Sequence, residues 1–191
     1  MNHSSLRKRI QQTLWESFRK STNHDVDEKG YVSSVEQNLL PGVTLDLFQH
    51  DLAQGSGNEL EGKFKAVHSS SALAVNTFAP FTKDPARLSL ANMKGFTKVQ
   101  FERQCPTGLG GTPPNLDVIA ESSTAIVAIE SKFLEYLTPK KPHFAKSYTR
   151  DNLPEAEEFH FPARGHVHLW QYNGEAGLHP QCPVREACPG G

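Results

Sequence analysis

Residues 111–133 constrain the fold more than any other part of the chain, because they have the pattern of a β-hairpin. Apolar and β-branched residues fill two arms, around Leu116–Ile119 and Ile126–Ile129. The polar run Glu121–Thr124 between the arms is typical of a turn. The second arm is apolar at every position, as in a strand covered on both faces. The segment therefore predicts two paired strands in the interior of a sheet.

Three charged residues stand out on this hairpin. Asp117 lies on the first arm, and Glu130 and Lys132 lie two residues apart at the end of the second. Because side chains alternate along a strand, Glu130 and Lys132 should point to one side and Ser131 to the other. Charges that end an apolar strand are costly without partners or a function. The alternative is an edge hairpin on which these groups are solvated surface charges.

Composition favours one ordinary domain with a single core, since the chain has 191 residues, 37% of them hydrophobic, and a net charge of −1. No apolar run approaches the ~20 residues that cross a bilayer, and no apolar stretch follows the charged N-terminus. We therefore expect a cytoplasmic protein without a membrane partner. Three cysteines make a disulfide framework improbable. The neutral charge does not exclude nucleic acid, which responds to local basic clusters.

The segments before the hairpin predict helices followed by a strand. Residues 5–20 have the apolar spacing of an amphipathic helix, and residues 21–57 read as a long connection. A second helix is predicted over Asn58–Phe81, with Glu59 in its first turn, and Phe96–Glu102 alternates like a strand. The order is one helix followed by three strands, which are expected to be antiparallel.

Residues 151–191 differ in composition from the rest, with five Pro and five Gly but no Lys, Ser, Thr or Ile. We expect an irregular tail, disordered or aberrant, in which only residues 166–172 look like a strand. A metal site would use His166, His168, Cys182 and Cys188. Their spacing matches no standard zinc pattern. The predicted division is thus an N-terminal helix and linker (1–57), a core (58–150) and this tail.

Asp117, followed after twelve residues by Glu130-Ser131-Lys132, resembles the signature of the PD-(D/E)XK nuclease superfamily. The sequence Pro114-Asn115-Leu116-Asp117 departs from the literal Pro-Asp by two inserted residues. The resemblance covers residues 58–137 and also extends to a group of prokaryotic restriction-endonuclease-like proteins. It implies an α/β (α+β) fold with an α-β-β-β-α-β core, the acids lying on the second and third strands.

The resemblance also implies an activity and a set of site residues. The expected function is a Mg²⁺-dependent endonuclease of restriction or defence type that hydrolyses DNA phosphodiester bonds, with Mn²⁺ as an alternative metal. Asp117, Glu130 and the backbone carbonyl of Ser131 would bind the metal, and Lys132 would act on the attacking water. These are the groups that metal-assisted hydrolysis needs, since Mg²⁺ prefers oxygen ligands. Glu59 would be a supporting acid, with Glu61 as its competitor and Glu102 as a further candidate.

DNA is the expected partner, and a homodimer is an option. Lys140, Lys141 and Lys146 lie past the expected site in residues 138–150, which contain no acid, and they suit a surface that tracks phosphates. A solvated helix explains these lysines equally well. Two other functions stay open: a non-catalytic nucleic-acid-binding module of the same fold, and a small His/Cys metal-binding protein.

Overall fold

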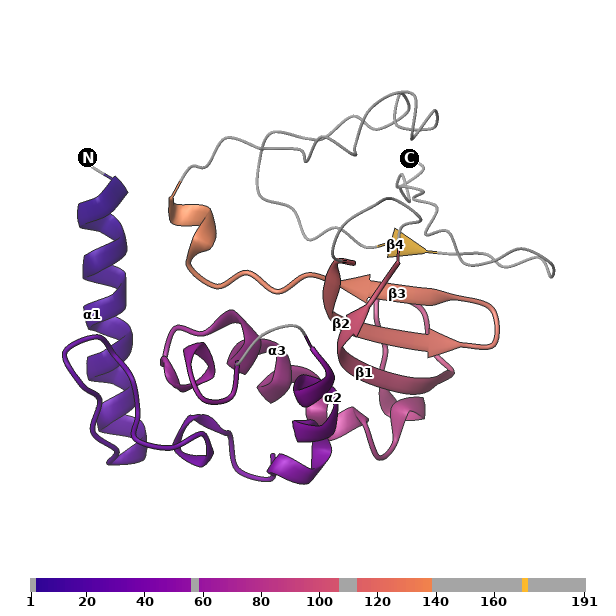
Figure 1. The fold of residues 1–191 in the computed structure, drawn as a ribbon, viewed down its shortest axis with the longest axis horizontal. Helices are drawn as coiled ribbons and strands as arrows, with labels where there is room; N and C mark the ends of the chain where they lie inside the picture. Colours follow the sequence, from indigo (N-terminus) through magenta and orange to yellow (C-terminus); the bar gives the residue numbers. More distant parts are fainter. Residues whose placement is uncertain (1–2, 56–58, 107–112, 139–169, 172–191) are drawn as a thin grey trace.

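The computed structural model describes residues 3–55, 59–106, 113–138 and 170–171 (Figure 1). Its helices are α1 (His3–Thr22), α2 (Gln49–Gln54) and α3 (Ser70–Phe78), and its strands are β1 (Phe96–Gln104), β2 (Asn115–Ser122), β3 (Ile126–Ile129) and β4 (Trp170–Gln171). In the view of Figure 1, α1 stands at one side of the molecule and the sheet at the other, with α2 and α3 between them. No helix in this described part is long and apolar enough to cross a membrane.

The strands form one sheet in the order β1-β2-β3-β4, and each neighbouring pair is antiparallel. The predicted hairpin is present as β2 and β3, with Val118 opposite Ile129 and Glu121 opposite Ile126. The class is therefore α+β, with an antiparallel sheet as expected. In the second arm, Val127 is fully buried, and Ala128 and Ile129 are each 8% exposed, so the strand is covered on both faces.

The hydrophobic core lies between this sheet and the helical half of the molecule. Phe48, which precedes α2, stacks on Phe64 with ring centroids 5.5 Å apart, and both rings are buried. Val75 of α3 and Val118 of β2 belong to the same buried cluster. Burying such side chains contributes about 2 kcal/mol each. The core therefore holds the site-bearing strands against α2 and α3.

The helix predicted over residues 58–81 is wrong over its first half. Lys63–Lys65 form only a 3₁₀ turn, and α3 begins at Ser70. Gly62 leaves the helical region, with φ −117° and ψ −105°, and Ser69 caps α3 by accepting a hydrogen bond from Ala72 N at 3.2 Å. Phe64 is nevertheless buried. The apolar spacing that resembled a helix thus marks a turn that inserts one ring into the core.

From α3 onward, the described elements follow the order helix, β1, β2, β3. The second helix of the expected nuclease core would fall in residues 139–169, outside the described residues. Lys140, Lys141 and Lys146 lie there as well, and so do His166 and His168, while Cys182 and Cys188 lie in the undescribed range 172–191. β4 pairs antiparallel with β3 through Val127 and Ala128.

The N-terminal helix is confirmed as α1, and Trp15 lies on its inward side against Gly30 and His68. Gly30 has φ +83°, and an added Cβ there would overlap the Trp15 indole. The Trp15 and His68 rings lie 6.3 Å apart. Burial lowers the pKa of His68, and the positive charge of Arg7 lowers it further, whereas Glu135 raises it. The lowered pKa therefore favours a neutral His68 where it packs against α1, which carries Arg7.

Gly30→Ala is expected to destabilise the protein by more than about 2 kcal/mol, because a left-handed backbone costs a residue with a Cβ about 1–2 kcal/mol and Trp15 must also move. Gly42→Ala is the matched control, since Gly42 has φ +88° but open space around it. Urea unfolding of both variants separates the backbone cost from the loss of Trp15 packing. Equal destabilisation of the two would show that Trp15 contributes nothing at this contact.

Candidate active site at the end of the sheet

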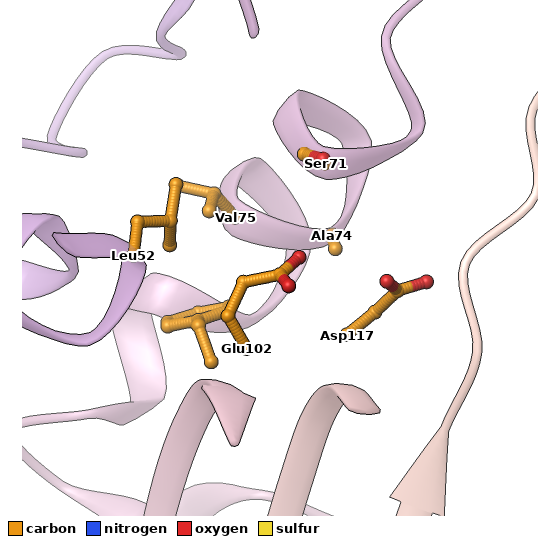
Figure 2. A pocket seen from close by; sticks show the side chains of 7 residues that line it. Leu52, Ser71, Ala74, Val75, Glu102 and Asp117 are labelled. Atoms are coloured by element: carbon orange, nitrogen blue, oxygen red, sulfur yellow. The ribbon is translucent and has the colours of Figure 1, made fainter. Parts of the chain in front are cut away.

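Three carboxylates lie at one end of three neighbouring strands. The pairing of Phe101 with Val118 and of Arg103 with Leu116 puts Glu102 of β1 across from Asp117 of β2. Glu130 follows β3 directly, one position beyond the pair formed by Val118 and Ile129. Figure 2 shows the side chains of Glu102 and Asp117 rising from adjacent strands below α3. These two residues line a narrow pocket together with Ser71 and Ala74 of α3.

Asp117 is half-buried and bonded to the segment after β3. Its Oδ2 accepts a hydrogen bond from Ser131 N at 2.5 Å. Burial raises the pKa of Asp117, and the negative charge of Glu130 raises it further, while the Ser131 N–H and the Lys132 ammonium act in the opposite direction. Without a cation, burial and the charge of Glu130 thus disfavour the ionised form of Asp117.

Glu130 and Lys132 lie together as an ion pair. β3 ends at Ile129, so both residues lie beyond the regular strand that the sequence suggested for them. Burial alone lowers the pKa of Lys132, but the hydrogen bond and charge of Glu130, helped by Asp117, outweigh it and leave that pKa raised. Lys132 is therefore a protonated ammonium that neutralises part of the carboxylate charge.

Glu102 adopts a left-handed backbone conformation with φ +48°. Its Oε2 accepts a hydrogen bond from Asn115 Nδ2 at 3.3 Å. Burial raises the pKa of Glu102, Asp117 raises it further, Asn115 lowers it, and Glu59 and Glu130 add smaller upward contributions. The negative charges of Asp117, Glu59 and Glu130 therefore all raise the pKa of Glu102.

Glu59 lies in a turn well before α3, and not in a first helical turn as predicted. Its Oε2 accepts a hydrogen bond from Ser71 Oγ of α3 at 3.3 Å. This contact brings Glu59 next to Ser71, which lines the same pocket, and the charge of Glu59 raises the pKa of Glu102. Glu61 lies in the same turn.

A polar network joins the segment after β3 to the start of α3. Ser131 Oγ donates to Ser70 O at 2.9 Å, Ser70 Oγ donates to Glu135 Oε1 at 2.5 Å, and Phe133 N donates to Ser70 Oγ at 3.2 Å. Burial raises the pKa of Glu135, but the bonds from Ser70 and the backbone outweigh it and leave that pKa lowered. Sequence reasoning missed Glu135, because it belongs to no motif. Glu135 follows Lys132 by three residues and begins a short 3₁₀ turn. The network holds Ser131 and its neighbours in place.

The donor set suits a hard divalent cation, because it consists of carboxylate oxygens, and burial together with the charge of a neighbouring carboxylate raises the pKa values of Asp117 and Glu102. Within the described residues, no group of three His, Cys, Asp or Glu side chains is placed closely enough to hold a metal by itself. Two carboxylates, a backbone carbonyl and water would complete such a coordination shell, and Mg²⁺ usually keeps several waters.

Comparison with known protein families gives a match over residues 7–176 to the family described as "Restriction Endonuclease associating with ARP". No curated protein and no solved structure gives a significant match to the chain.

Proposed function

Because the chain belongs to the family "Restriction Endonuclease associating with ARP", we propose that it is a Mg²⁺-dependent endonuclease of the PD-(D/E)XK type that hydrolyses DNA. The observation that carries the proposal is the hydrogen bond from Ser131 N to Asp117 Oδ2 at 2.5 Å. This bond joins the two chain segments that bear the acids of the motif. It places Ser131, the middle residue of Glu-x-Lys, directly against the aspartate.

In this proposal Asp117, Glu130 and the carbonyl of Ser131 would hold the metal, with Glu59 as a supporting acid. A divalent cation bound there would activate water at neutral pH and would stabilise charge that develops on the phosphate. Lys132 would act from its position in the ion pair with Glu130. Its ammonium is suited to orient the attacking water and to offset the charge of the scissile phosphate.

Glu130→Ala tests the proposal. On a supercoiled circular plasmid with Mg²⁺, wild-type protein should nick or linearise the DNA, and the variant should do so about 10²–10³-fold more slowly, because several kcal/mol of charge stabilisation are lost. Binding of the variant to a fluorescent duplex, measured by anisotropy, should largely survive, since most affinity comes from phosphate contacts elsewhere.

Glu121→Ala is the matched control, because Glu121 is a carboxylate near the other end of β2 from Asp117, where it forms an ion pair with Arg103 and, among the described residues, no hydrogen bond or ion pair with the proposed metal ligands. It should leave the cleavage rate unchanged. Undiminished cleavage by clean Glu130→Ala protein would overturn the proposal. Wild-type protein that binds the duplex but never cleaves it would instead favour the non-catalytic nucleic-acid-binding function.

A further inference from the structure

Glu102 stands out because its backbone conformation is not one that a strand requires. Its φ of +48° lies in the left-handed region, which residues with a Cβ rarely adopt and glycine adopts freely. The pairing of β1 with β2 continues on both sides of it, at Phe101 and Arg103. The unusual conformation is therefore confined to the one residue of β1 that carries a carboxylate at the candidate site.

Neighbouring groups hold Glu102 in this conformation. Phe101 N, immediately before it, donates to Asp51 Oδ2 of α2 at 3.0 Å. Gly55 follows α2 and leaves room for Glu102, since a Cβ added at Gly55 would lie 3.2 Å from the Cβ of Glu102. Asn115 Nδ2 donates to the carboxylate itself at 3.3 Å. The contact from α2 thus fixes the residue before Glu102, and Gly55 and Asn115 lie against the Glu102 side chain itself.

This arrangement puts Glu102 beside Asp117, where two like charges on adjacent strands repel one another. Both side chains line the same pocket below α3 (Figure 2). A residue needed only for the backbone bend would be served better by glycine or asparagine. Besides the amide of Asn115, a carboxylate at this position gains a partner of opposite charge when a cation lies near Asp117.

We infer that Glu102 is a positioning residue of the proposed nuclease site, whose carboxylate holds the water ligands of a divalent cation bound at Asp117. The inference rests on the proposed function and extends it: the cation affinity of the site depends on a third strand, β1, in addition to the two that carry the motif. Glu102 adds to the supporting role proposed for Glu59, whose negative charge raises the pKa of Glu102.

Two variants of the full-length protein test this inference. Glu102→Gln removes the charge and keeps the size of the side chain, whereas Glu102→Gly also relieves the left-handed backbone. Glu121→Gln serves as the matched control on the same sheet. The readouts are the Mg²⁺ concentration that gives half-maximal plasmid cleavage and the rise in Tm that Mg²⁺ or Ca²⁺ produces.

Both Glu102 variants should need about 10-fold or more Mg²⁺ for half-maximal cleavage, as expected when a residue that supports a metal ligand is lost. Their metal-induced rise in Tm should shrink, while the metal-free Tm of Glu102→Gly should equal or exceed that of wild type. A purely structural role would change the metal-free Tm and leave the Mg²⁺ dependence as in wild type, and that result would overturn the inference. If wild-type protein shows neither cleavage nor a metal-induced rise in Tm, the proposed function itself fails.

Discussion

Replacement of Asp117 by asparagine is expected to reduce Mg²⁺-dependent DNA cleavage by about 10³-fold, since a lost metal ligand removes several kcal/mol of charge stabilisation. Asparagine keeps the shape of the side chain, and its Oδ1 can still accept the hydrogen bond that Ser131 N donates to Asp117. The loss of activity should therefore come from the missing charge and not from a rearranged hairpin.

The same substitution should leave the metal-free protein at least as stable as wild type near pH 7. Burial and the charge of Glu130 raise the pKa of Asp117. The folded state thus binds this proton more tightly than the unfolded state, so the contribution of Asp117 to stability is greatest at low pH and falls as pH rises through the folded pKa. Asparagine cannot ionise and avoids this loss.

Thermal unfolding at pH 7 and near pH 4, each with and without Mg²⁺, checks both statements. The advantage of Asp117→Asn in Tm should be present at pH 7 without metal and should shrink toward pH 4. Addition of Mg²⁺ should raise the Tm of wild type and not that of the variant. A variant that is clearly less stable than wild type at pH 7 would mean that Asp117 serves the fold, and it would count against the proposed site.

Asn38→Leu is expected to destabilise the protein by about 3 kcal/mol, because it leaves two buried carbonyl oxygens without their donor. Asn38 is 8% exposed, and its Nδ2 donates to Phe64 O at 2.7 Å and to Ala66 O at 3.0 Å. These bonds close the turn that inserts Phe64 into the core. Leucine has a similar size but no donor.

Urea unfolding of this variant beside Gln37→Leu measures the effect. Gln37 is the preceding residue, and its side chain makes exposed hydrogen bonds to Ser33, so its replacement should change the free energy of unfolding by less than about 0.5 kcal/mol. Equal stability of the two variants would show that the Phe64 turn is held by packing alone.

The hairpin was predictable because the residues within its two arms determine its structure locally. β-branched residues at consecutive positions and a polar run between them specify paired strands without help from distant contacts. The same holds for α1, whose apolar residues recur at four-residue steps. The α+β class and the antiparallel pairing follow from these local signals.

The turn around Phe64 was not predictable in the same way, because its cause lies elsewhere in the chain. Its apolar spacing fits a helix, and the donor that stabilises the alternative, Asn38, lies 26 residues earlier. Gly62 and Ser69 were the available local signals, since one interrupts helices and the other caps them. The 3₁₀ conformation itself depends on tertiary contacts that spacing does not encode.

The residues of the candidate site also differ in whether local sequence or tertiary packing determines them. Asp117, Glu130 and Lys132 carry a motif with fixed spacing, so they could be named from the sequence as site residues, and their role stays a proposal. The conformation of Glu102 and the link from Glu135 to Ser70 depend on which elements pack together, over a separation of 65 residues in the second case. The resemblance named Glu102 as a further candidate, but alternation gives no reason for its backbone conformation, and no motif includes Glu135.

The contact between Asp51 and β1 also bears on how the molecule behaves in concentrated solution. β1 is the outer strand of the sheet, and exposed outer strands can recruit extended segments of other chains and lead to aggregation. Asp51 Oδ2 already occupies the outward N–H of Phe101. An incoming extended chain would have to displace a charged side chain to hydrogen-bond there, so α2 blocks this position of the edge against pairing with another strand.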